Sequence, residues 1–181
     1  MMKKEFLLWV IVIGALALMT PTLKAEATSS VDCFGIKRID GRKEAPAFSL
    51  KDLSGNQVAL SQYMGRPVLL FFWASYCGSC KEDIVPFEKF CLRESNQFDV
   101  LTLVIDGEKE KRVKKCVEKF KITLPVLLDV KEKIARSYGV WMIPTVFLIN
   151  REGRMEGMIV GQRDWGGSTA LPAVKELLNL R

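Results

Sequence analysis

The fold of this chain is decided by residues 68–81, which read VLLFFWASYCGSCK. The first six of them form an apolar run unbroken by charge, which is typical of a buried parallel strand. Cys77 and Cys80 follow, separated by two residues. The apolar residues after the pair recur at helical spacing: Ile84, Phe87 and Cys91. The stretch therefore predicts a strand over 67–73 and a helix over 78–93 that begins at the cysteine pair.

A cysteine pair at the start of a helix is typical of redox chemistry. The helix N-terminus offers unpaired N–H groups and a partial positive charge, which favour a thiolate at Cys77. Cys80 lies about one turn further on, close enough for a small disulfide. A structural disulfide or half of a zinc site is the alternative, but zinc needs four ligands and the chain has no His. We therefore expect Cys77 to be the catalytic attacking thiolate and Cys80 the resolving thiol, without a metal or cofactor.

The flanking pattern alternates strands with helices and predicts an α/β sandwich with a mixed central sheet. Strands are expected at 98–105 and 126–128, and hairpins pair 48–50 with 58–60 and 145–150 with 155–160. Helices are expected at 109–121, at 131–138, and from 168 or 169 to 179.

With these residues the chain resembles the thioredoxin-like thiol–disulfide interchange proteins of the bacterial cell envelope, the TlpA/ResA type. The resemblance runs from about Glu44 to the C-terminus, and several stretches carry it: Ala45–Leu50, Gly55-Asn56, Gly65–Pro67, Phe72–Ala74, Tyr138–Val140 and Ile143–Ile149. It implies a thioredoxin fold, three-layer α/β/α with a mixed sheet, an N-terminal β-hairpin extension and a helix–strand insertion at 109–128.

The resemblance also implies a substrate-binding groove beside the cysteines. The family carries a cis proline where Pro144 stands, and the residue before it, here Ile143, pairs with an extended substrate. Without the resemblance, Pro144 would be interpreted as an ordinary trans proline at the start of an edge strand. Trp73 and Tyr76 are expected to line the groove, although Trp73 could equally belong to the core.

One departure from thioredoxins concerns proton transfer. Thioredoxins carry a buried Asp where this chain has Phe71, so the proton acceptor for Cys80 stays open among three acidic residues: Glu82, Asp83 and Glu88. Ser79 could donate a hydrogen bond to the Cys77 sulfur or face solvent.

Three further cysteines remain, namely Cys33, Cys91 and Cys116. Cys91 and Cys116 fall on apolar helix faces and are expected to be small buried hydrophobic residues. An auxiliary disulfide among the pairs 33–91, 33–116 and 91–116 is the alternative.

The N-terminus predicts export. Lys3 and Lys4 precede an uncharged stretch over 6–19, and Ala25-Glu26-Ala27 supplies small residues two apart. This pattern predicts a signal peptide over 1–27. An uncleaved anchor is the alternative, but the stretch is shorter than the roughly 20 residues that span a bilayer. Residues 28–43 are interpreted as a flexible lead-in and 44–181 as the thioredoxin-like domain, in the periplasm or on the outer face of the cytoplasmic membrane.

Charge argues against nucleic acid as a partner. Removal of 1–27 leaves a net charge of +5, interpreted as spread along the chain. The basic stretch at 108–115 contains the interleaved glutamates Glu108 and Glu110 and no aromatic residues, which favours a solvated helix face. At most a weak preference for acidic partner surfaces is expected.

These observations predict a monomeric thiol–disulfide oxidoreductase that acts on protein disulfides. No cationic residue stands between the cysteines to stabilise the thiolate strongly, which favours a reductant over an oxidant. The family often serves cytochrome c maturation, so apocytochrome c is a candidate substrate, and a membrane electron donor would restore the reduced form. The alternatives are a metal-handling relative, which usually needs a His, and a thiol peroxidase, which would carry Thr in place of Ala74.

Overall fold

The structure is a computed structural model in which residues 29–41 and 43–180 are described. The predicted signal peptide or anchor over 1–27 lies outside the described residues. Among the described helices, none combines the length and the apolar character that crossing a membrane requires.

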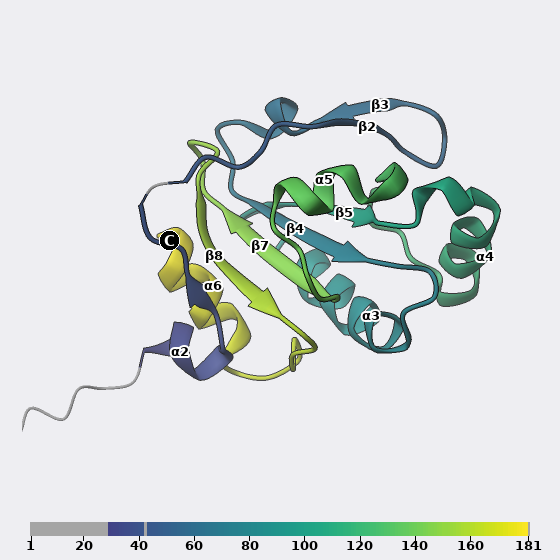
Figure 1. The fold of residues 1–181 in the computed structure, drawn as a ribbon. Coiled ribbons are helices and arrows are strands. Elements are labelled where there is room, and N and C mark those ends of the chain that lie inside the picture. Colours follow the sequence, from purple (N-terminus) through teal and green to yellow (C-terminus); the bar gives the residue numbers. More distant parts are fainter. Residues whose placement is uncertain (1–28, 42, 181) are drawn as a thin grey trace, which may run out of the picture.

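A six-stranded mixed sheet forms the centre of the molecule, in the order β1-β8-β7-β4-β5-β6 (Figure 1). Its strands are β1 (Lys37–Arg38), β4 (Val68–Trp73), β5 (Asp99–Val104), β6 (Val126–Leu128), β7 (Thr145–Ile149) and β8 (Met155–Val160). The central strand β4 runs parallel to β5 and antiparallel to β7. A separate hairpin joins β2 (Ser49–Lys51) to β3 (Gln57–Ala59), as the sequence predicted.

Helices cover both faces of the sheet, which confirms the predicted three-layer arrangement (Figure 1). They are α2 (Ser30–Phe34), α3 (Gly78–Arg93), α4 (Glu110–Phe120), α5 (Lys133–Ser137) and α6 (Ala170–Leu178). Successive residues of β4 point to opposite faces. Phe71 stacks on Phe87 of α3 with ring centroids 4.8 Å apart, and Phe72 packs against Tyr138 after α5 at 5.3 Å.

The segment before the domain differs from the predicted flexible lead-in. Residues 30–34 form α2, and Lys37–Arg38 pair with Met158 and Gly157 of β8. The physical reason is burial, because Val31, Phe34 and Ile36 are almost completely excluded from solvent. The Phe34 ring packs edge-on against Trp165, at 5.1 Å between centroids.

The helix predicted over 131–138 is shorter than expected and begins at Lys133. Lys131 and Glu132 adopt positive φ angles of 58° and 57°, which an α-helix does not allow. The buried Asp129 carboxylate accepts the backbone N–H groups of Ile134 and Ala135, at 2.9 and 2.8 Å, and so fixes the start of α5.

Candidate active site

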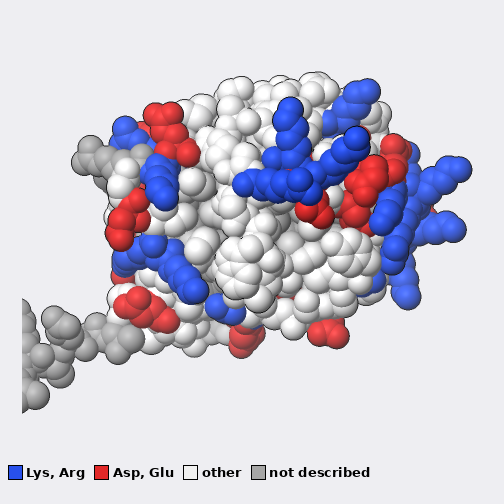
Figure 2. Space-filling model, viewed as in Figure 1, with Lys and Arg blue, Asp and Glu red and all other residues white. Residues whose placement is uncertain are grey.

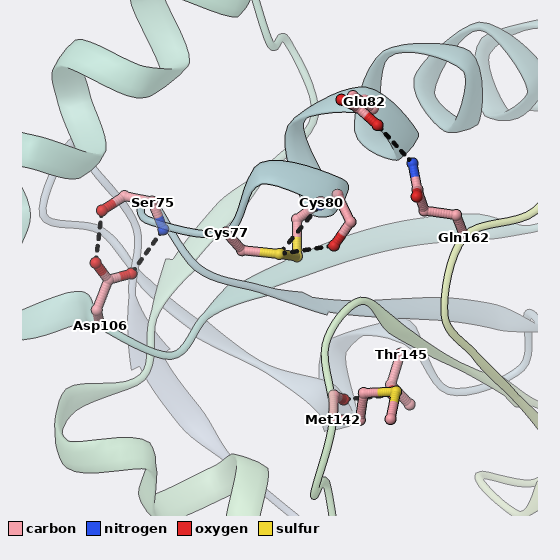
Figure 3. The surroundings of a disulfide bond; sticks show 9 residues. Ser75, Cys77, Cys80, Glu82, Asp106, Met142, Thr145 and Gln162 are labelled. Carbon is pink, nitrogen blue, oxygen red and sulfur yellow. Dashed lines mark hydrogen bonds between the residues drawn. A yellow bond between two sulfur atoms is a disulfide. The ribbon is translucent and has the colours of Figure 1, made fainter.

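Cys77 and Cys80 form a disulfide at the N-terminus of α3, with their Cα atoms 5.3 Å apart (Figure 3). Cys77 occupies the N-cap position, and its sulfur accepts the Cys80 backbone N–H at 3.1 Å. Ser79 Oγ lies 3.4 Å from the same sulfur, so of the two alternatives left open for Ser79 the hydrogen bond is the one present. Cys77 is 9% exposed and Cys80 is fully buried, so a partner reaches the disulfide from the Cys77 side.

The loop that carries Cys77 is fixed by a buried carboxylate. Ser75 donates its backbone N–H to Asp106 Oδ1 at 2.9 Å and its hydroxyl to Asp106 Oδ2 at 2.5 Å (Figure 3). Both residues are 3% exposed. The sequence reasoning missed Asp106. Its signal was an Asp directly after an apolar strand, because parallel neighbouring strands end at the same edge of a sheet.

The peptide bond between Ile143 and Pro144 is cis. Thr145, the first residue of β7, lies opposite Phe72 of β4 in the antiparallel register. The residues before β7 and those after β4 therefore leave the sheet at the same edge. This register brings the segment 141–144, which includes Met142 (Figure 3), to the end of the sheet that carries Cys77.

Three exposed apolar side chains lie in these two segments. Tyr76 is 50% exposed, Trp141 69% and Met142 45%, whereas Ile143 is half-buried. Burial and the nearby carboxylates of Asp106, Glu132 and Glu108 raise the pKa of the Tyr76 phenol.

Trp73 does not line a groove. Its side chain is fully buried, so the prediction of a contact surface is wrong and the alternative, a core residue, is correct. All six residues of β4 are buried, and a strand covered on both faces leaves no exposed position for Trp73.

Of the three acidic candidates for proton transfer, Asp83 has the environment closest to such a role. Glu82 is exposed and accepts a hydrogen bond from Gln162 at 3.2 Å (Figure 3). Glu88 is occupied, since one of its oxygens accepts hydrogen bonds from the backbone and hydroxyl of Thr123. Asp83 is 2% exposed and lies three residues after Cys80, on the same side of α3.

Two groups hold the Asp83 carboxylate from the segment before α6. The Arg163 backbone N–H donates to it at 3.1 Å and the Trp165 indole N–H at 3.3 Å. Burial raises the pKa of Asp83 above its ordinary value of 3.8, and the hydrogen bonds from Arg163 and Trp165 oppose that rise.

Comparison with known proteins assigns the family. The AhpC/TSA family profile matches residues 42–158. The chain belongs to the AhpC/TSA family. It is 33% identical over 119 residues to the thiol-disulfide oxidoreductase ResA of Geobacillus thermodenitrificans, which covers 65% of this chain and 67% of that protein.

Solved structures agree with this assignment. StoA from Bacillus subtilis superimposes with a TM-score of 0.62 at 25% identity, covering 72% of this chain and 97% of StoA. The exposed lipoprotein thioredoxin Etrx1 of Streptococcus pneumoniae gives 0.63 at 31% identity, covering 72% of this chain and 99% of that one. The chain is thus a thiol–disulfide oxidoreductase with a thioredoxin-like fold, as predicted.

The other three cysteines of this family member are free thiols. Cys91 and Cys116 are buried, at 2% and 6% exposure, which confirms the expected packing role over an auxiliary disulfide. Burial raises the pKa of both thiols, that of Cys91 strongly, with Glu88 adding to the rise. Cys33 is exposed on α2.

Proposed function

We propose that this oxidoreductase reduces disulfides of other proteins, with Cys77 as the nucleophile and Cys80 as the resolving thiol. The observation that carries the proposal is the difference in burial between the two sulfur-bearing residues. Cys77 retains exposure at a helix N-terminus, while Cys80 lies beneath it. Only the outer cysteine is open to a protein-sized partner.

The reaction conserves electrons and protons as follows. The Cys77 thiolate attacks one sulfur of the substrate disulfide, forming a mixed disulfide and releasing the other sulfur as a thiolate. Cys80 loses its proton and attacks the Cys77 sulfur, which releases the second substrate thiolate. Two electrons pass to the substrate, and its thiolates take up two protons.

Asp83 is the proposed acceptor of the Cys80 proton. A buried carboxyl with a raised pKa exchanges protons closer to neutral pH than an exposed one does. Glu82 is too exposed to offer the same environment, and Glu88 already accepts three hydrogen bonds at Oε1, from Thr123 and Leu124.

The substrate is proposed to lie across the segments 76–77 and 141–144. Ile143 and Pro144 would align an extended segment of the substrate, and Tyr76 would contact it beside the cysteine. Trp141 and Met142 add exposed apolar area to the same edge, which suits a polypeptide better than a small polar disulfide.

The proposed compartment is the periplasm or the outer face of the cytoplasmic membrane. It rests on the sequence of residues 1–27, where a charged start precedes an uncharged stretch. Disulfides persist outside the cytoplasm, so a reductant there needs a membrane electron donor. Apocytochrome c is one candidate substrate, and the monomer is the proposed form.

Insulin reduction tests the proposal. The reduced wild-type protein should cleave the insulin disulfides, and Cys77→Ser should abolish the reaction. Cys80→Ser should accumulate mixed disulfides through Cys77, visible by mass spectrometry. Substrate trapping through Cys80 in the Cys77→Ser variant would show that the assigned roles are reversed.

A further inference from the structure

The net charge of residues 28–181 is concentrated in one segment, although it was interpreted from the sequence as spread along the chain. Residues 28–181 carry 24 basic and 19 acidic side chains. Residues 109–121, which comprise α4 and one residue on either side, hold seven of the basic and two of the acidic ones. This segment therefore carries +5, and the other residues of 28–181 balance to zero. Figure 2 shows Lys and Arg side chains gathered at the α4 end of the molecule.

The basic side chains cover the outer face of α4. Val113 and Cys116 turn inward and are buried, whereas all seven cationic residues are exposed: Lys109, Lys111, Arg112, Lys114, Lys115, Lys119 and Lys121. Within the described part of the chain, only Lys114 among them forms an ion pair, with Glu110 at 2.6 Å.

A row of like charges runs along this face. Lys111, Lys115 and Lys119 stand four residues apart, so their ammonium groups are neighbours and repel one another. An acidic surface laid along the helix would relieve that repulsion, whereas water and salt only screen it.

This basic helix adjoins the loop that carries the disulfide. Asp106 holds Ser75 through its carboxylate, and its backbone carbonyl accepts the Lys109 backbone N–H at 2.9 Å, one residue before α4 begins. In Figure 1, α4 lies beside the loop between β4 and α3. Lys81, in the first turn of α3, is close enough to α4 to oppose the rise in the pKa of Cys116.

We propose that the exposed face of α4 docks an acidic surface of the protein that exchanges disulfides with Cys77. This inference rests on the proposed function and specifies the charge of the partner. The apolar residues Tyr76 and Trp141 would contact the partner near its cysteine, while α4 engages its acidic flank.

The surroundings of α4 favour a protein over a membrane as that acidic surface. The described chain begins at α2, and α2 and α4 lie at opposite ends of the molecule in Figure 1. A bilayer next to the N-terminal end would therefore face away from α4. Acidic groups near Tyr76 would repel an acidic partner. One of them, Glu132, is paired with Arg136 at 3.4 Å, which partly neutralises its charge.

The test measures rate constants for reduction of two peptide disulfides of equal length. One peptide carries Asp and Glu in the segments that flank its disulfide, beyond the residues next to the cysteines, and the other carries Lys there. The reduced wild-type protein is compared with Lys111→Gln/Lys115→Gln/Lys119→Gln and with a matched control, Lys37→Gln/Lys89→Gln/Arg151→Gln, whose positions are also exposed. Hydroxyethyl disulfide, which is small and uncharged, checks that every variant keeps intact chemistry.

At about 0.01 M salt, we expect the wild type and the control to reduce the acidic peptide about 10-fold faster than the α4 variant does. At about 1 M salt the difference should vanish, because charges are then screened within a few ångströms. Equal rates for the α4 variant and the control at low salt would overturn the inference. The inference would also be overturned if the α4 variant lost binding to phosphatidylglycerol vesicles but reduced the acidic peptide as fast as the control does. A wild type that reduces neither peptide would instead refute the proposed function.

Discussion

The carboxylate of Asp106 holds Ser75 through two hydrogen bonds, one from the backbone N–H and one from the hydroxyl. Ser75 stands two residues before Cys77, and Asp106 follows the neighbouring strand β5. The position of the reactive loop is thus set by a charged group in the sheet layer, as well as by the helix that begins at Cys77.

Ser75→Ala removes the hydroxyl donor from this pair. Because the bond is buried and its acceptor is charged, we expect the free energy of unfolding to fall by about 1.5–3 kcal/mol. Urea denaturation measures the change. Ser54→Ala, at an exposed turn position, is the control and should stay within about 0.5 kcal/mol of wild type. A Ser75→Ala protein as stable as this control would show that the pair does not hold the loop.

Asp83→Asn should change how stability depends on pH. Burial raises the pKa of Asp83 in the folded state, so the folded chain binds this proton more tightly than the unfolded chain does. Stability from this group is therefore present at low pH and is lost as pH rises from about 4 through the raised pKa. The wild type should lose stability relative to Asp83→Asn over that range, measured by urea denaturation at each pH.

Glu82→Gln is the matched control for this experiment, because it removes an exposed carboxyl from the same helical turn. Its stability should run parallel to that of the wild type. A wild-type protein that gains stability relative to Asp83→Asn as pH rises would contradict the raised pKa.

Phe34→Ala tests whether the N-terminal segment belongs to the folded domain. The Phe34 ring is buried against Trp165, and removal of a buried Phe side chain costs about 3–5 kcal/mol. Thermal or urea denaturation should show a loss of this size. Cys33→Ala, one residue earlier and exposed, is the control and should have little effect. A small effect of both changes would restore the interpretation of a flexible lead-in.

The free cysteines should differ in reactivity while the Cys77–Cys80 disulfide is intact. Cys33 is exposed, whereas burial raises the pKa of Cys91 well above its ordinary value. Iodoacetamide at about pH 8 should therefore modify Cys33 first and Cys91 only after unfolding, as read by mass spectrometry. Cys91→Ala should cost about 1 kcal/mol and leave disulfide exchange intact. Loss of exchange in a folded Cys91→Ala protein would give this thiol a redox role.

Local patterns were enough to predict most of the elements. The apolar run 68–73 predicted β4, and the helical spacing of apolar residues after Cys80 predicted α3. Both predictions succeed because most of the residues that are buried in these elements are themselves apolar. The segment 30–38 was not predictable in this way. Its few apolar residues are buried by Trp165 and α6, which are more than 120 positions away in the sequence.

The candidate site was predicted in part for the same reason. The cysteine pair and Pro144 belong to recognisable sequence motifs. The residues that contact the side chains around them in the fold belong to no such motif. Trp73 sits in a strand that is apolar throughout, so the sequence offered no alternation from which to assign its face. The contacts of Asp83 with Arg163 and Trp165 join residues 80 or more positions apart, and no local pattern reports them.

The two-residue strand β1 also determines how the sheet ends. β8 pairs with β7 on one side, and β1 covers Met158 and Gly157 on its other edge; without β1 that edge would present unpaired N–H and C=O groups to any passing strand, which is a template for aggregation. Lys37 and Arg38 occupy that border instead, and both side chains are exposed and charged. At the opposite border, β6 spans three residues only. We therefore expect variants that detach the N-terminal segment to self-associate through the uncovered edge of β8.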